Sequence, residues 1–587
     1  MTTLLIHPAD DPEVGPWASE KWSRIIDLGL AGRATYERWS RRFDCPVLSI
    51  YSLGSGFEAV GRVRSLIASG LGKVTDSAGI DWWQIAVAYL YSELETLVWL
   101  HRVAEIMEPH EDACITRSGF HADALRQMLG GHLRTSAAAA SRPSAAIRYL
   151  EIARRLPLWQ VAQIFWDKYD PALEIRRRFA RRAGTPDAAV VLLPSAYVNV
   201  TRTALDYAKT APGLKFLLVA ARRSAWTDDL PANVRGEWLA SYARRAMQHA
   251  ECSEILEKWT QARARLEEEP EIAVLGRLGL MDNFPKRFRD GLKLRAVWES
   301  VFQRERIQSV LCADDSNHWT LLPLLLARKF GVPAIACHHG ALDGQRIFKQ
   351  NAADVVLAKG EMEQDYLVRV CRVPAGDVEI GAPARAANPK PSVSGVQGVK
   401  PLITFFSEPY ETFSGRGQEF YRDLLPPLAD LARQTGRKLV IKLHPAENRS
   451  ERKRIVDDLL TPDQRQAVNL ATGSTTPGLL QQTWFGITVL STVASECAVA
   501  GVPCFLCRWL EFTHHGYLDQ FLRFGVGLEL REPSDIARIP QLLETYSANP
   551  RVAANVWQPI DRGRLDEVLT GRAGWKRRAA MELQRAQ

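Results

Sequence analysis

The fold is decided by residues 307–384, where four short apolar runs follow one another. They are IQSVLCADDS (307–316), VPAIACHHG (332–340), ADVVLAKG (353–360) and DVEIGAPA (377–384). Each run ends in Gly, Asp, His or Pro, which is typical of strands that are buried on both faces and deliver a polar loop at their carboxyl ends. Apolar runs of this kind that alternate with helical patterns predict a parallel sheet with crossover helices.

The same alternation extends to both sides of this stretch. It begins at DAAVVLLPS (187–195) and restarts with LITFFSEP (402–409) and KLVIKLHPAE (438–447), after a Pro/Gly/Ser/Lys segment at 387–401 that predicts a linker. We therefore expect an α/β protein with two Rossmann-like domains that face each other and an N-terminal α/β extension. The expected bounds are 1–185 for the largely helical extension, 186–390 and 400–555 for the two Rossmann-like domains, and 556–587 for a basic C-terminal helix.

The first 180 residues carry weaker patterns. We expect strands in LLIHPAD (4–10), CPVLSIYSL (45–53) and DACITRSG (112–119). Residues 81–107 are apolar almost all round, which predicts one long buried helix. The Ala- and Arg-rich residues 137–182 are expected to be helical, and no motif with a chemical meaning is evident in this part.

The composition limits the class of protein. The chain has 587 residues, of which 46% are hydrophobic and 24% charged, as in a globular protein with a large core. The formal net charge of +8 is a small excess that favours anionic partners without naming one. No apolar run approaches the roughly 18 residues of a membrane span, and acidic residues follow closely on the N-terminus. We therefore expect a cytoplasmic protein.

The cysteines and the C-terminal residues add two expectations. Nine cysteines are scattered along the chain, and the pair Cys504 and Cys507 is expected to lie buried in a strand rather than to bind zinc. Basic residues surround Trp575, which predicts either a helix attached to an anionic inner membrane leaflet or a solvated terminal helix. No basic stripe with interleaved aromatic residues appears, so nucleic acid is not an expected partner.

Ligands of open α/β sheets bind beyond the carboxyl ends of the strands, so polar residues at those ends are candidates. Lys442, His444 and Pro445 follow one predicted strand. The lysine and histidine can supply positive charge and N–H donors to a phosphate, and the proline fixes the turn. The alternative is a histidine held by its own loop.

A second cluster begins about fifty residues later with Ser491, Thr492 and Ser495. Hydroxyls and free backbone N–H groups at a helix N-terminus form an anion site. Glu496 is either a capping residue or an acceptor for a ribose hydroxyl. The alternative for the whole cluster is ordinary N-capping.

The third cluster is HHG, in which His338 and His339 precede Gly340, with Asp343 shortly after. A histidine there is a candidate general base, because its pKa lies near the operating pH, and we prefer His339. The alternative is a structural turn.

The fourth cluster comprises Asp314, Asp315, Asn317 and His318. A carboxylate at a strand end can act as a base or hold a histidine in one tautomer. The alternatives are a plain helix cap and, less favoured, a metal site, since no complementary ligand spacing appears. No phosphate loop, strand-linked GxGxxG, HExxH or GxSxG is present, which argues against several common enzyme classes.

Residues 300–530 resemble the GT-B glycosyltransferases of bacterial surface polysaccharide synthesis. The resemblance rests on HHG, on KLHP and on the S-T-x-x-S-E helix start before GVP. The relatives with an HP motif are capsule Kdo transferases, sialyl- and polysialyltransferases, and CDP-glycerol-using teichoic-acid polymerases. The resemblance implies transfer of a sugar, such as CMP-linked Kdo or a nonulosonate, to a glycan or lipid-linked acceptor. It also implies that neither a metal nor another cofactor is needed.

The resemblance implies roles for the candidate residues. His444 and Pro445, with Ser491, Thr492 and Ser495, would hold the nucleotide in the second domain. The base would be His339 of the HG motif or a carboxylate such as Asp315 in the first, acceptor-side domain. The D/E-D/N-G element of the sialyltransferases is not cleanly matched by Leu-Asp343-Gly344 or Asp314-Asp315-Ser. Three alternatives stay open: a sugar-nucleotide epimerase, a glycerophosphotransferase, and a non-catalytic sugar-nucleotide-binding scaffold.

Overall fold

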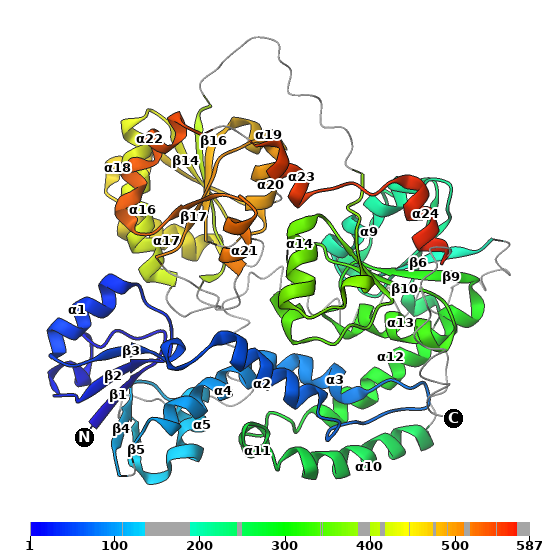
Figure 1. Ribbon diagram of the computed structural model, residues 1–587, viewed down its shortest axis with the longest axis horizontal. Coiled ribbons are helices and arrows are strands. Elements are labelled where there is room, and N and C mark those ends of the chain that lie inside the picture. Colours follow the sequence, from blue (N-terminus) through cyan, green and yellow to red (C-terminus); the bar gives the residue numbers. More distant parts are fainter. Residues whose placement is uncertain are drawn as a thin grey trace. The chain divides into compact units, whose positions relative to one another are not determined.

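The computed structural model contains three parallel β-sheets with helices on their faces (Figure 1). The chain divides into two compact units. One unit is Met1–Arg62, Glu93–Pro157 and Gly395–Ala554, and the other is Val63–Ser92, Leu158–Ser394 and Asn555–Gln587. The structure describes residues 2–108, 110–135, 188–242, 249–340, 342, 344–384, 400–410, 417–444, 447–473, 477–489, 491–509, 517–546 and 549–571.

The N-terminal sheet has five parallel strands in the order β3-β2-β1-β4-β5. The strands are β1 (Thr2–Ile6), β2 (Arg24–Asp27), β3 (Val47–Ser49), β4 (Asp112–Ile115) and β5 (Leu133–Thr135), with helices α1 (Arg33–Phe43), α2 (Gly56–Ala68) and α5 (Phe120–Leu129). The strands expected in 4–10, 45–53 and 112–119 are confirmed. Strands β2 and β5 were not predicted, because each contributes only a few apolar residues to the sequence pattern.

The helix predicted over 81–107 is interrupted. Helix α3 (Trp82–Val87) ends in a 3-10 turn (Ala88–Leu90), after which α4 (Tyr91–Glu105) continues. No Gly or Pro lies between residues 82 and 105, so no local signal in the sequence marks the break.

The middle sheet has seven parallel strands in the order β12-β11-β10-β9-β6-β7-β8. They are β6 (Val190–Ser195), β7 (Phe216–Ala220), β8 (Val234–Trp238), β9 (Ile307–Cys312), β10 (Ala334–Cys337), β11 (Val355–Ala358) and β12 (Val378–Ile380). The helices are α9 (Val198–Thr210), α10 (His249–Leu266), α11 (Pro270–Arg277), α12 (Phe284–Arg304), α13 (His318–Lys329), α14 (Glu361–Asp365) and α24 (Arg562–Thr570). All four runs of residues 307–384 form strands, which confirms the pattern that decides the fold.

The C-terminal sheet has six parallel strands in the order β15-β14-β13-β16-β17-β18. They are β13 (Leu402–Phe406), β14 (Lys438–Lys442), β15 (Val468–Ala471), β16 (Thr483–Thr488), β17 (Cys504–Cys507) and β18 (Leu528–Leu530). The helices are α16 (Gly417–Gln434), α17 (Arg449–Leu459), α18 (Pro462–Gln466), α19 (Pro477–Gln482), α20 (Val493–Ala500), α21 (Tyr517–Arg523), α22 (Ile539–Glu544) and α23 (Pro550–Val556). Numbered within the sheet, this order is 3-2-1-4-5-6, the Rossmann order.

The predicted α/β class, with two Rossmann-like sheets and an N-terminal α/β extension, is therefore confirmed. All nine cysteines are free thiols, and Cys504 and Cys507 lie buried in β17 as expected. Within the described ranges, no helix combines the length and the apolar character needed to cross a membrane. The expected linker at 387–401, the helical residues 137–182 and the basic residues around Trp575 lie almost entirely outside the described residues.

Candidate functional site

The strand order defines one switch point in each Rossmann-like sheet. The chain first builds the middle sheet from β6 toward β8 and then returns to add β9 on the other side of β6. In the C-terminal sheet the corresponding neighbours are β13 and β16. Ligands of such sheets bind beyond the carboxyl ends of the strands at this point. The predicted polar clusters follow β9, β10, β14 and β16, so they lie at or beside the two switch points.

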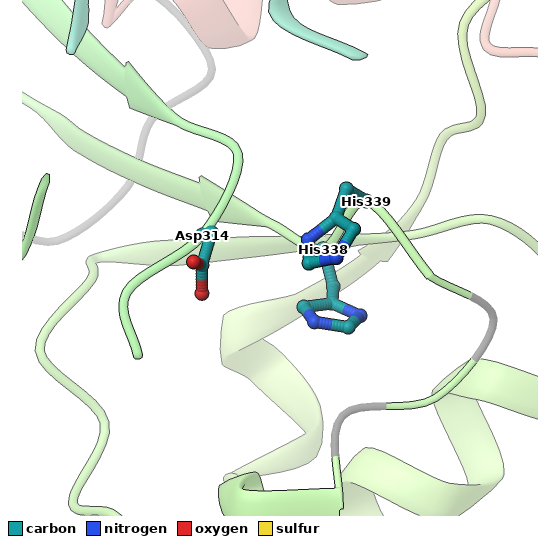
Figure 2. A group of neighbouring side chains, drawn as sticks. All are labelled: Asp314, His338 and His339. Carbon is teal, nitrogen blue, oxygen red and sulfur yellow. The ribbon is translucent and has the colours of Figure 1, made fainter. Parts of the chain in front are cut away.

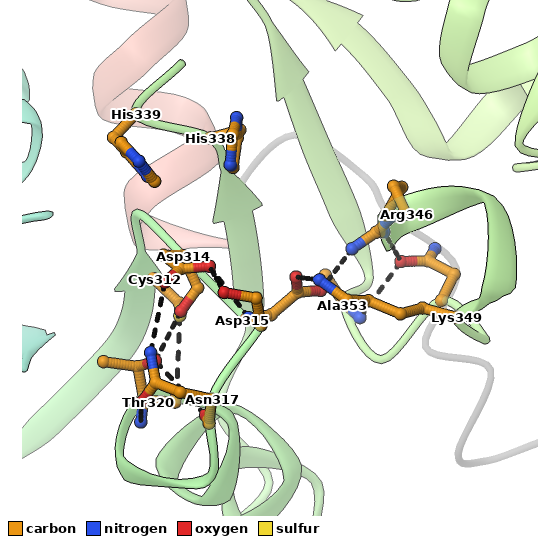
Figure 3. Close-up of polar contacts among 12 residues, drawn as sticks. Cys312, Asp314, Asp315, Asn317, Thr320, His338, His339, Arg346, Lys349 and Ala353 are labelled. Atoms are coloured by element: carbon orange, nitrogen blue, oxygen red, sulfur yellow. Dashed lines mark hydrogen bonds and ion pairs between the residues drawn. The ribbon is translucent and has the colours of Figure 1, made fainter. Parts of the chain in front are cut away.

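Asp314 follows β9 and is fully buried (Figure 3). Its Oδ1 accepts hydrogen bonds from the Ser316 backbone N–H (2.8 Å) and hydroxyl. Its Oδ2 accepts from the Tyr197 hydroxyl (2.5 Å) and from the Asn317 amide (3.1 Å). Four donors therefore hold this carboxylate in place.

His338 and His339 follow β10 and lie beside Asp314 (Figure 2). The His339 ring packs edge-on against Tyr197, with its Nδ1 3.5 Å from the Tyr197 hydroxyl. His338 Nδ1 accepts from the Gly340 backbone N–H at 3.1 Å. Tyr197 thus stands between the buried carboxylate and the histidine. Sequence reasoning missed this tyrosine, because only the strand order reveals that the residues after β6 lie beside those after β9.

A buried lysine holds the turn that carries both histidines. The Lys359 ammonium donates to the backbone carbonyls of His338 and Gly340, and it lies 3.7 Å from the Glu363 carboxylate. Both Lys359 and Glu363 are buried. Burial raises the pKa of Glu363, and Lys359 opposes this effect. Lys359 ends the apolar run VVLAK, which is the signal that could have identified it.

A metal ion could be held by Asp314, His338 and His339, whose ligand atoms lie within 4.8 Å of one another. However, both oxygens of Asp314 already accept hydrogen bonds from protein groups. A metal would have to displace these donors, which are arranged to fix the carboxylate. The geometry therefore suits an acid–base site better than a metal centre.

Asp315 points to a different set of partners. Its carboxylate forms a buried ion pair with Arg346 and a second one with Lys349 at 3.2 Å (Figure 3). Both oxygens of Asp315 are therefore engaged by cationic partners. This arrangement favours a structural role for Asp315 over the role of base that the sequence left open.

His318 opens helix α13, and its Nδ1 hydrogen-bonds with the Tyr89 hydroxyl. Burial, with Arg287 and Arg222, lowers its pKa to about 4. It lines a cavity of about 60 Å³ together with Tyr89 and Asp315. His318 is therefore neutral at pH 7. Asp343 lies outside the described residues.

In the C-terminal sheet, Lys442 is buried at the end of β14. Its ammonium donates to the carbonyls of Gly473 (2.5 Å) and Leu443 (3.1 Å). Burial lowers its pKa, while Glu447 and Glu496 oppose this shift. Lys442 therefore connects the loop after β15 with the loop after β14 by hydrogen bonds. The sequence did not predict this role.

His444 is exposed, and its backbone N–H donates to Glu447 Oε2 at 2.7 Å. Glu447 Oε1 also accepts from Ser407 (2.7 Å), Tyr421 (3.0 Å) and Arg452 (2.6 Å). Glu447 thus fixes the conformation of the loop that presents His444. Desolvation lowers the pKa of His444, with Glu447 opposing. Pro445 lies outside the described residues.

The second predicted cluster forms the start of α20. Ser491 Oγ accepts from the Val493 backbone N–H at 3.4 Å, and Thr492 occupies the cap position without a side-chain cap bond. Ser495, in the first turn of α20, is 6% exposed, and its hydroxyl has no partner among the described residues. Glu496 interacts electrostatically with Lys442. The clusters after β14 and β16 therefore meet across β13, which pairs with both strands.

Glu408 is the residue of this site that sequence reasoning missed. It follows β13 at the switch point, is 9% exposed and accepts a hydrogen bond from Ser491. Burial raises its pKa to about 7; Ser491 opposes this shift and Glu447 adds to it. Its Oε2 has no partner in the part of the chain that the structure describes. The run LITFFSEP carried the signal, since a charged residue lies two positions after the end of a buried strand.

No model of a protein family and no curated protein matches the chain. Solved structures that are similar include the S. aureus MnaA–UDP co-structure, at 13% identity with a TM-score of 0.38, covering 65% of this chain and 95% of that one. A UDP-GlcNAc 2-epimerase from Methanocaldococcus jannaschii has 10% identity and a TM-score of 0.39, over 65% and 99% of the chains. CalG4, the calicheamicin glycosyltransferase, has 12% identity and a TM-score of 0.35, over 68% and 97%. Because all these TM-scores lie below 0.5, the fold assignment rests on the strand order of the sheets.

Proposed function

We propose that the chain is a glycosyltransferase of the GT-B type that uses a nucleotide-activated sugar. One observation carries the proposal: the two Rossmann-like sheets present different chemistry at their switch points. The C-terminal sheet offers a helix start with hydroxyls for an anion. The middle sheet offers a histidine backed by a buried carboxylate. Glycosyl transfer needs both, an anion site for the leaving nucleotide and a base for the acceptor.

The anion site accounts for departure of the nucleotide. Negative charge builds on the phosphate as the bond to the sugar breaks, and preorganised donors stabilise that charge. We assign this role to the N-terminus of α20, the hydroxyls of Ser491, Thr492 and Ser495, and the imidazole of His444. We propose a CMP-linked acidic sugar as the donor, because the HP and S-T-x-x-S-E motifs resemble those of enzymes that use such donors.

The middle sheet supplies the base. Tyr197 donates its hydroxyl proton to Asp314, and the tyrosine oxygen can at the same time accept from His339 Nδ1–H. This tautomer keeps the lone pair of the ring on Nε2. We propose that His339 Nε2 removes the proton from an acceptor hydroxyl, and that Asp314 acts through Tyr197 to hold the ring. The acceptor we propose is a glycan or a lipid-linked glycan.

A sugar-nucleotide epimerase is the second candidate, because two histidines and a carboxylate lie together at one strand end. An epimerase takes a proton from a sugar carbon and returns it, so it turns over without an acceptor. Incubation of the nucleotide sugar alone in D2O would place deuterium on the sugar if the chain were an epimerase. A transferase would leave the sugar unlabelled.

The test of the proposal is a thermal-shift panel of CMP, CDP, UDP and GDP. A ligand that binds the folded state raises its melting temperature, so we expect a rise with CMP. The rise should be lost in His444→Ala and kept in His339→Ala, while only the wild-type chain transfers sugar. No rise with any of the four nucleotides would overturn the proposal.

A further inference from the structure

Two polar atoms at the C-terminal switch point lack partners. They are Glu408 Oε2 and Ser495 Oγ, neither of which is hydrogen-bonded within the described ranges, although both residues are more than nine-tenths buried. Buried polar groups are almost always satisfied, so two such atoms at one site point to a missing ligand. Ser491 joins them, because it hydrogen-bonds to Glu408 and lies four residues before Ser495, just ahead of α20.

The groups around Glu408 leave its charge uncompensated. Ser491, from the start of α20, is a neutral donor, and Glu447, from the loop after β14, is a second carboxylate. Glu447 is itself paired with Arg452 of α17 and Tyr421 of α16. Tyr410, two residues later in the chain, also interacts with Glu408. The titratable groups that face the site are Glu408, Glu447, Tyr410, Tyr421, Arg452, Lys442, His444 and Glu496.

We propose, building on the function proposed above, that Glu408 binds the phosphate of the nucleotide as a neutral carboxylic acid, so that nucleotide binding takes up one proton from solvent. A carboxylate beside a phosphate would repel it in a site of low polarity. The protonated acid instead donates its O–H to a phosphate oxygen, as only a neutral carboxyl can. Ser495 donates to the same anion, and the Ser491 hydroxyl turns from Glu408 to the anion when the nucleotide binds. Burial already raises the pKa of Glu408 to about 7, so the proton is taken up at small cost near neutral pH.

Isothermal titration of CMP into the full chain, in two buffers of different ionisation enthalpy, measures this proton uptake. The matched control is Glu408→Gln, which keeps the shape and the donor of the neutral acid but cannot titrate. Relative to this variant, we expect the wild type to take up about half a proton at pH 7 and nearly one at pH 8.5. Protonation of CMP itself contributes equally to both proteins and drops out of the difference.

A second measurement uses the affinity. If only the protonated form of Glu408 binds, the Kd of CMP for the wild type should rise from pH 6.5 to pH 8.5 by a factor about 25 times larger than the Kd for Glu408→Gln, because titration of CMP and of His444 affects both proteins. Equal proton uptake by the two proteins, or an equal pH dependence of their Kd values, would overturn this inference and leave the proposed function standing. If none of CMP, CDP, UDP and GDP binds to either protein, the proposed function and this inference both fall.

Discussion

Replacing Tyr197 with Phe tests the link between the buried carboxylate and the histidine. The change removes the hydroxyl that donates to Asp314 and that lies 3.5 Å from His339 Nδ1. Asp314 keeps its bonds from Ser316 and Asn317, so the carboxylate stays satisfied. His339 loses the acceptor that fixes its tautomer.

The expected loss follows from the kind of hydrogen bond removed. Hydrogen bonds to charged groups contribute about 1.5–3 kcal/mol, so losing the link at the transition state should lower kcat about 10- to 150-fold. The KM for the donor and the thermal shift with CMP should not change, because the nucleotide site lies in the other Rossmann-like sheet. The assay is release of the nucleotide from the donor with acceptor present, followed over a range of donor concentrations.

Tyr207→Phe is the matched control. Tyr207 lies in helix α9, which begins directly after Tyr197; it is fully buried and donates to the Gly381 carbonyl at 2.7 Å. Its loss should lower the free energy of unfolding by about 1 kcal/mol and leave kcat unchanged. Wild-type kcat in Tyr197→Phe, or an equal fall in both variants, would refute the reasoning that Tyr197 positions the base.

Three further predictions concern ionisable side chains that are wholly or partly buried. Asp315→Asn should lower the free energy of unfolding by about 3 kcal/mol, because it leaves two buried cations without their carboxylate. Unfolding with urea measures this loss, and a stability equal to that of the wild type would contradict the ion-pair geometry. Glu447→Gln should weaken CMP binding as well as stability, since it releases the loop that Arg452 and Glu447 hold; isothermal titration checks this, with Arg433→Gln on the surface as control. The pKa of His318 is lowered to about 4, so the folded state binds fewer protons than the unfolded state between about pH 4 and 6.5, and stability should fall as the pH drops through this range. His318→Gln should flatten that slope in urea titrations, and an unchanged slope would show that other groups cause it.

Much of the fold could be predicted because the strands are short, apolar and evenly spaced. The runs ending at Cys312, Cys337 and Ala358 are buried on both faces, and this leaves a pattern that local reasoning detects. The break at residues 88–90 left no such trace. No Gly or Pro marks it, so it is set by tertiary packing and not by local propensity.

The site was predicted only where one strand end was sufficient to identify a residue. His339, Asp314 and Ser491 each follow a strand and carry a group with evident chemistry. Tyr197 and Glu408 also follow strands, but their importance depends on which strand lies next to theirs. Pairing of β6 with β9, and of β13 with β16, joins residues about 80 to 120 positions apart in the chain. Strand order is a property of the whole sheet, so a tyrosine after β6 acquires a partner only when β9 inserts beside it. The same reasoning applies to Glu408: Ser491 and Glu447, which act on its carboxyl group, come from the segments after β16 and β14 and not from its neighbours in sequence.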